Sequence, residues 1–278
     1  MLLREFAIRR QLGLAGLCLL GLVYGIFNEG IIAKTFYLAA NVPIKNFDGY
    51  GYVFGLAIPW AITISVWHAL HSFVYPVVAV CYFFPEHRQA PWLNRPACGL
   101  LAMPTVLVGT LMFFHADRDR AAGHPVHFLL MLVVSGLLLW LATRLGPRPA
   151  LGDEARVPTP TILLGGLAFL ALVLVPILLA AAKIPVTIFY GYNALLVVLI
   201  LWRLRRQAAW PINQVLLFAI GDDTVLALFG LAGAVGAGSI QRICTNGCFL
   251  LLFGWVWRRL LEELNRLDRK NRIAGTKP

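Results

Sequence analysis

The 278-residue chain has few charged residues for its length. Charged side chains make up 13% of the residues, whereas hydrophobic side chains make up 59%. A soluble domain carries about 25% charged and about 45–50% apolar residues, so the composition argues against a soluble protein. Disorder is excluded as well, because disordered chains are poor in apolar groups and rich in charge. Five cysteines spread over the whole chain do not form a disulfide framework.

Long apolar runs are what the sequence does have. A membrane-spanning helix needs about 20 mostly apolar residues, and we identify eight such runs, with no room for a soluble domain between them. They predict an all-α polytopic membrane protein with about eight transmembrane helices. The second contains Pro59 and Pro76 and is either one long, kinked or tilted helix or a helix with a re-entrant segment. The runs are 11–33, 52–84, 97–115, 124–144, 160–182, 185–204, 213–236 and 239–259.

The positive charges predict the orientation of these helices. With the N-terminus in the cytoplasm, the inner segments hold 18 Lys and Arg residues and the outer segments hold 6, as the positive-inside rule requires. The net charge of +11 is therefore a topology signal and does not indicate nucleic-acid binding. We expect both termini in the cytoplasm and one transmembrane domain over 1–278, with a basic cytoplasmic tail at 258–278 that is a possible docking helix for a partner protein.

Ionisable residues inside a membrane helix are costly, so they mark candidate functional sites. Asn28 and Glu29 lie near the end of the first run, and His68 and His71 lie on one side of the second. If these helices pack antiparallel, Glu29 and His68 can meet. Glu29 is then either a functional carboxylate or a residue that reaches the interface near Lys34. The two histidines are either hydrogen-bonded core residues, or proton-transfer groups, or ligands of a divalent metal ion.

The seventh run contains two adjacent acidic residues, Asp222 and Asp223. Acids at mid-membrane require a polar cavity or protonation, and adjacent positions on a helix point about 100° apart. Weaker candidates are a CxxxC pair and a loop rich in histidine, for which helix packing and a solvated turn are the competing interpretations. They are Cys244 and Cys248, and the loop residues His115, Asp117, Asp119, His124 and His127, which could bind a divalent ion.

The stretch from Gly25 to Leu93 resembles a family of small polytopic prokaryotic membrane proteins. The shared pattern is an acidic residue followed by Gly in FNEGIIAKTF, then HAxxS and a proline in the second run, then a PWL element in APWLNRP. The resemblance implies a plasma or inner membrane protein of a prokaryote and implies no activity.

Two shorter likenesses concern intramembrane proteases. Glu29 followed by His68 on the next helix is similar to the CPBP family of CAAX-processing-like enzymes, whose first motif is a Glu pair followed by Arg. Ala219-Ile220-Gly221-Asp222 is similar to the GxGD motif of membrane aspartyl proteases. Those enzymes use a second aspartate on an earlier helix, and the corresponding place here, Tyr190-Gly191-Tyr192-Asn193, has Asn193.

Three functions follow as hypotheses. The first is a membrane-embedded hydrolase, with Glu29 as the base and His68 and His71 orienting water or holding a metal. The second is a proton- or cation-coupled transporter that binds its ion at Asp222 or Asp223, with Asn193 and Asn28 as further polar positions. The third is a scaffold or accessory subunit.

Overall fold

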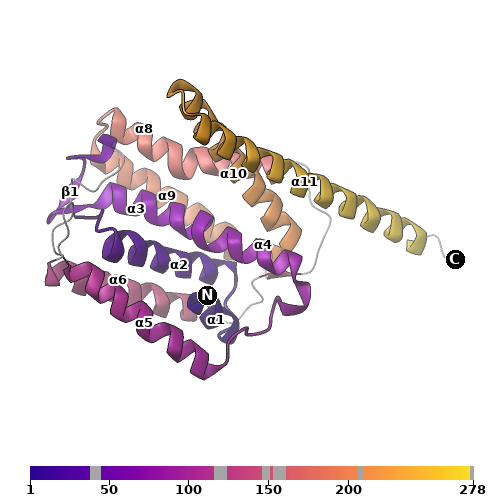
Figure 1. Ribbon diagram of the computed structural model, residues 1–278, viewed down its shortest axis with the longest axis horizontal. Coiled ribbons are helices and arrows are strands. Elements are labelled where there is room, and N and C mark those ends of the chain that lie inside the picture. Colours follow the sequence, from indigo (N-terminus) through magenta and orange to yellow (C-terminus); the bar gives the residue numbers. More distant parts are fainter. Residues whose placement is uncertain (38–44, 116–123, 146–150, 153–160, 206–209, 276–278) are drawn as a thin grey trace. The chain divides into compact units, whose positions relative to one another are not determined.

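Helices make up nearly all the regular structure of the computed structural model, which describes residues 1–37, 45–115, 124–145, 151–152, 161–205 and 210–275 (Figure 1). The α-helices are α1 (Leu2–Arg9), α2 (Leu14–Gly25), α3 (Ile58–Trp67), α4 (Tyr75–Phe83), α5 (Arg95–Phe114), α6 (Pro125–Arg144), α7 (Thr161–Phe169), α8 (Val175–Ala181), α9 (Val186–Arg205), α10 (Ile212–Gly236) and α11 (Ile240–Gly275). Wider π-helical segments are η1 (Ile26–Ile32), η4 (His68–Val74) and η6 (Leu170–Leu174). Short 3₁₀ turns are η3 (Lys45–Phe47) and η5 (Pro85–His87), and the strands are β1 (Tyr52–Val53), β2 (Leu56–Ala57), β3 (Leu151–Gly152) and β4 (Trp210–Pro211). The predicted all-α class is confirmed.

Within the described residues, seven helices are long and apolar enough to cross a membrane. They are Leu14–Ile32, Ile58–Phe83, Arg95–Phe114, Pro125–Arg144, Thr161–Ala181, Val186–Leu204 and Ile212–Gly236. Each matches one predicted run. The eighth run lies in α11, which is helical over 36 residues but is not among the seven, because polar residues from Arg242 to Asn246 dilute its apolar part. Large exposed apolar side chains on α5, α6 and α9, such as Leu100, Val126 and Leu195, suit contact with lipid.

The second span begins six residues later than the sequence predicted. The prediction of one helix over 52–84 was wrong at its start, because strands β1 and β2 form a hairpin there. The central residues of the hairpin, Phe54 and Gly55, both have positive φ, at 49° and 76°, which matches the tight turn that joins such strands. The helix starts at Ile58, so Pro59 lies in its first turn, where a missing N–H costs nothing.

The expected distortion near Pro76 takes the form of the π-helical segment η4. A proline inside a helix removes one hydrogen bond and its ring clashes with the carbonyl four residues earlier, which here is that of Ser72. The segment from His68 to Val74 widens the turn directly before this position, and the helix continues to Phe83 as α4. The same arrangement recurs where η6 precedes Pro176.

The described residues form two compact units. Unit 1 comprises Met1–Gly152 with Leu172–Trp210, and unit 2 comprises Asp153–Ala171 with Pro211–Pro278. In unit 1 an aromatic core forms around Phe47, Trp60 and Phe189, with ring centroids 5.5 Å apart for Phe47 and Trp60 and 6.5 Å apart for Phe47 and Phe189. In unit 2 the main packing is that of α10 against α7 and α11.

Helix α1 was not expected from the sequence, and it packs against the segment after α4. The guanidinium of Arg4 stacks on Trp92, 3.6 Å from the ring centroid, and donates to the carbonyl of His87 at 2.8 Å. Glu5 accepts from the backbone N–H of Trp92 at 2.8 Å and pairs with Arg4 at 3.2 Å. Arg4 and Glu5 are each only 2% exposed. The contact joins two segments that the charge pattern assigns to the same side of the membrane.

Candidate functional site

Two glycines bring the first two spanning helices of unit 1 into close contact. A Cβ on Gly21 would lie 2.7 Å from the Cα of Ala69, and a Cβ on Gly25 would lie 2.8 Å from the Cα of Ser65. Small residues at this spacing let membrane helices approach through their backbones. Glu29 follows four residues after Gly25 on the same helix, and this contact therefore determines where its carboxylate lies.

The structure brings Glu29 and His68 together, as the antiparallel packing predicts. Nε2 of His68 lies 2.9 Å from Oε1 of Glu29, and the two side chains are 10% and 12% exposed. Nδ1 of the same ring lies 2.9 Å from Oγ of Ser72. With the Nε2 proton donated to the carboxylate, Nδ1 is free to accept the hydroxyl proton of Ser72. Carboxylate, imidazole and hydroxyl thus form one continuous hydrogen-bonded chain.

Further polar groups hold the carboxylate of Glu29 in place. The hydroxyl of Thr35 donates to Oε2 at 2.6 Å and accepts from the indole N–H of Trp60 at 3.0 Å. Nδ2 of Asn28 donates to Oε1 at 3.3 Å and lies 3.1 Å from Nε2 of His68. A buried carboxylate is tolerated only when it is paired and hydrogen-bonded, and both oxygens of Glu29 meet that condition.

Both members of the pair lie in π-helical segments, Glu29 in η1 and His68 in η4. Such segments are rare and occur frequently at functional sites. Lys34, the alternative partner considered for Glu29, donates instead to the carbonyl of His115 at the end of α5. It is 2% exposed, and its backbone, with φ of 59°, turns the chain away after η1.

His71 lies in η4 in different surroundings from His68. Its ring packs against Trp67 and Tyr75, with centroids 5.1 and 5.4 Å away. Hydrogen bonds occupy both ring nitrogens of His68, so a metal shared with His71 would have to displace Ser72 or Glu29. The pairing of the two histidines on a divalent metal stays a prediction.

Asn193 lies apart from these hydrogen bonds, on α9. Its amide donates to the carbonyl of Phe189 at 2.9 Å, and the residue lines a cavity of about 680 Å³ between α2, α3, α6 and α9. Most of the lining is apolar, and Ser65, Tyr190 and Asn193 are its polar residues. Unit 1 therefore has a large apolar cavity beside a polar site.

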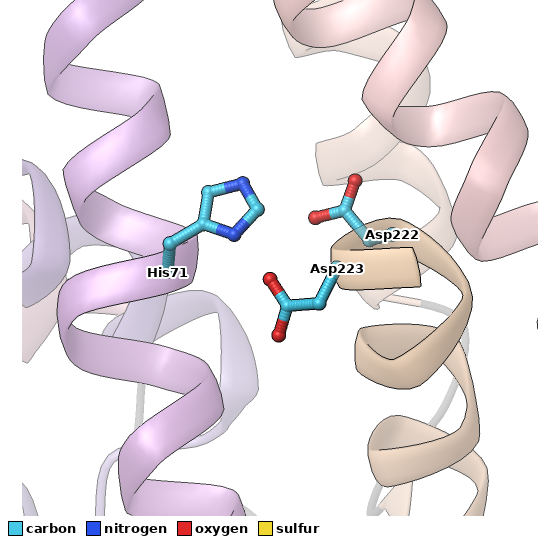
Figure 2. Close-up of side chains that lie close together, drawn as sticks. All are labelled: His71, Asp222 and Asp223. Carbon is cyan, nitrogen blue, oxygen red and sulfur yellow. The ribbon is translucent and has the colours of Figure 1, made fainter. Parts of the chain in front are cut away.

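In unit 2 the adjacent acids lie near the middle of α10. Their carboxylates leave the helix in different directions (Figure 2). Asp222 is 1% exposed, whereas Asp223 is half-buried. The glycine before them has a packing role, since a Cβ on Gly221 would lie 2.0 Å from the carbonyl oxygen of Ile162 on α7. Gly221 is thus explained without a protease motif.

The weaker candidates have ordinary surroundings. Cys244 and Cys248 are exposed thiols on α11. His127 stacks on Tyr37 with centroids 4.7 Å apart, and burial raises the pKa of the Tyr37 phenol above its ordinary value. His124 accepts from the backbone N–H of Val126 at the start of α6. Asp117 and Asp119 of the same predicted loop lie outside the described residues.

Three residues of the hydrogen-bonded chain around Glu29 and His68 were not predicted from the sequence, namely Ser72, Thr35 and Trp60. A signal for Ser72 was present, because the HAxxS element places its hydroxyl four residues after His68, one turn away on a helix. Thr35 and Trp60 carried no comparable signal, since both depend on how the chain turns after η1. Neighbouring Asn28 was predicted as an ion-binding position, and it lies at the Glu29–His68 pair.

Comparison with known proteins gives one match. The model of an uncharacterized membrane protein family matches residues 1–267, a far longer stretch than the quarter of the chain that carries the resemblance seen in the sequence. The match gives no support to a likeness with CPBP proteases. Neither the curated proteins nor the solved structures contain a match to this chain.

Proposed function

The chain belongs to an uncharacterized membrane protein family, and we propose from its own geometry that it is a membrane-embedded hydrolase. The observation that carries the proposal is the buried pair of Glu29 and His68, joined at 2.9 Å. A carboxylate that orients an imidazole and stabilises its protonated form makes it an effective general base. His68 then accepts the proton of the attacking nucleophile, and Glu29 stabilises the resulting imidazolium.

The surroundings of the pair support this role. Both side chains are largely buried inside unit 1, so they do not face the lipid. Thr35 and Asn28 fix the carboxylate, which keeps His68 in one orientation. Catalytic groups need such preorganised neighbours to work at low reorganisation cost.

Ester hydrolysis by the purified protein in liposomes tests the proposal. We expect p-nitrophenyl esters to be hydrolysed, and Glu29→Gln and His68→Gln to lower the rate by about 10²–10⁴-fold, as loss of general base catalysis does. The chain offers a matched control in the exposed pair Glu86 and His87, whose side chains are 62% and 60% exposed. Glu86→Gln and His87→Gln should leave the rate unchanged. Equal rates in all four variants, or no turnover of any ester, would overturn the proposal.

A second function, proton- or cation-coupled transport, is favoured by one observation in unit 2. Asp222 is 1% exposed near the middle of a span of 25 residues, and a carboxylate at that depth is costly and marks a candidate ion or proton site. Dye-reported proton flux into liposomes tests this function. Asp222→Asn should abolish flux that Asp223→Asn only weakens, and flux that is equal in both variants would argue against it.

Orientation and location complete the proposal. The excess of positive charge in alternate segments supports cytoplasmic termini, and the resemblance of the stretch from Gly25 to Leu93 to prokaryotic membrane proteins supports a prokaryotic plasma membrane. The packing of α1 against residues near Trp92 supports the same assignment, because it requires both segments on one side. Cysteines introduced singly at Arg10 and Arg95 should therefore react only with a thiol reagent that reaches the cytoplasm.

A further inference from the structure

We propose that Ser72 is the nucleophile of this site and that the substrate is an ester of a long-chain acyl group, whose chain lies in the cavity of unit 1. The inference rests on the proposed hydrolase function and gives it a covalent mechanism and a substrate class. It starts from two observations that the hydrolase proposal does not use. The first is the contact of Ser72 with His68. The second is the apolar cavity, whose lining residue Ser65 lies about one helical turn from His68.

The position of Ser72 suits nucleophilic attack. Its Oγ lies 2.9 Å from Nδ1 of His68, within the distance that proton transfer between nucleophile and base needs. The opposite nitrogen of the ring is held by Glu29 at 2.9 Å, which fixes Nδ1 as the acceptor. Carboxylate, imidazole and hydroxyl therefore have the connectivity of a nucleophile, a base and a residue that orients the base. Ser72 is half-buried.

The chemical step balances with these three groups. Nδ1 of His68 takes the hydroxyl proton while Oγ of Ser72 forms a bond to the carbonyl carbon of the ester. The bond between that carbon and the ester oxygen then breaks, and the departing alkoxide receives the proton from Nδ1. Water repeats the sequence on the acyl-serine, which releases the fatty acid and restores the hydroxyl of Ser72.

The cavity indicates the kind of acyl group. Its volume of about 680 Å³ lies within the range of about 300–1,000 Å³ that is usual for small-molecule sites. Two of its lining residues, Ile26 and Ser65, each precede a member of the pair by three residues, that is, by about one turn. Both helices that carry the pair therefore also line the cavity, about one turn from Glu29 on one helix and about one turn from His68 on the other.

The lining favours an acyl chain over a peptide. Among the described residues that line the cavity, the polar ones are Ser65, Tyr190 and Asn193. A peptide placed there would leave most of its backbone N–H and C=O groups without partners, which is costly in an apolar setting. A hydrocarbon chain has no such groups.

Labelling with a fluorophosphonate probe tests the nucleophile in the full-length protein in detergent micelles. We expect one adduct, located on Ser72 by mass spectrometry of the digested protein, and at least a 20-fold loss of labelling in Ser72→Ala. Ser135→Ala is the matched control, since Ser135 is a half-buried serine on α6, and it should label like the unaltered chain. Ser72→Cys serves as a second variant that keeps the size of the side chain, and it should lose the adduct as well.

Hydrolysis of p-nitrophenyl butyrate and p-nitrophenyl palmitate then tests the substrate class. Ala194→Trp fills the cavity and should lower the palmitate-to-butyrate rate ratio by at least 10-fold while butyrate turnover persists. An unchanged ratio overturns the acyl site. If Ser72→Ala still hydrolyses esters whereas His68→Gln does not, the Ser72 nucleophile is overturned and the hydrolase with a water nucleophile stands. If no variant and no unaltered protein hydrolyses any ester, the hydrolase function itself fails.

Discussion

The Glu29–His68 pair can be tested by its contribution to stability, independently of any activity. The perturbation is a set of three variants, His68→Leu, Glu29→Leu and the double variant. Leucine is chosen because it removes the polar group and keeps most of the side-chain volume. The structure predicts that the two single changes are costly and that the double change costs less than their sum.

The expected magnitudes follow from what each change leaves behind. Removing the hydrogen-bonding partner of a buried charged group costs about 3 kcal/mol or more, because the charge is left with less compensation. In His68→Leu the carboxylate keeps the hydroxyl of Thr35 at 2.6 Å, so we expect a loss at the low end, about 3 kcal/mol. In Glu29→Leu the ring of His68 keeps Ser72 but leaves one N–H without an acceptor, a loss of about 1–3 kcal/mol. The double variant leaves neither group behind, and we expect a coupling energy of about 2 kcal/mol, within the range for directly interacting residues.

Thermal unfolding in a mild detergent measures these differences. At roughly 2–4 °C per kcal/mol for a chain of this size, His68→Leu should lower the Tm by about 6–12 °C. Glu86→Leu with His87→Leu is the matched cycle for an exposed pair, and surface pairs of this kind contribute little. The reasoning is refuted if the Tm losses of the two single variants simply add in the double variant, or if the buried cycle gives no larger coupling than the exposed one.

Three further predictions concern the packing around the site and in unit 2. Thr35→Val removes the hydroxyl that bonds both Glu29 and an indole N–H, and it should lower the free energy of unfolding by about 1–3 kcal/mol, measured by the same Tm shift. Gly221→Leu should separate α7 from α10 and abolish folding of unit 2, and loss of a monodisperse peak on size-exclusion chromatography would report this. Gly233→Leu is the control and should fold normally, because a Cβ on Gly233 meets nothing within 4 Å. Trp92→Ala uncovers the guanidinium of Arg4 and should speed trypsin cleavage after that residue by several-fold, as N-terminal sequencing of the digest over time would show.

The sequence was sufficient to predict the spans and one of their contacts. Apolar length alone located seven helices, six of them to within a few residues at both ends. The costs of burying Glu29 and His68 pointed to a meeting of those two side chains. The hairpin at 52–57 was missed because its residues are apolar enough to extend a helical run. Gly51 and Gly55, with φ of 65° and 76°, are the signal that could have separated it from the helix.

Other parts of the site could not be read from the sequence for physical reasons. Whether a serine one turn after His68 bonds the ring or its own backbone depends on the local width of the helix, which no residue type specifies. The role of Trp60 depends on the fold of the chain after η1, where Thr35 is placed by tertiary contacts. Gly21 and Gly25 did carry a usable pattern, because small residues four positions apart favour close packing of membrane helices. The structure shows this packing, with Gly25 against α3 and Gly21 against η4.

The wide turn η4 also determines how the side chains of α4 are rotated about the helix axis relative to those of α3. A π-helical turn contains about one residue more than an α-helical turn, so side chains after Val74 are rotated by about 100° from where an unbroken α-helix would place them. The face of α3 that packs on Gly25 is therefore continued in α4 by residues at a shifted spacing. Removing a single residue from His68–Val74 would let the turn become α-helical while α3 and α4 keep their present buried faces. A one-residue deletion inside α3 or α4 has no wide turn to absorb it, and it would rotate the residues that follow by about 100°.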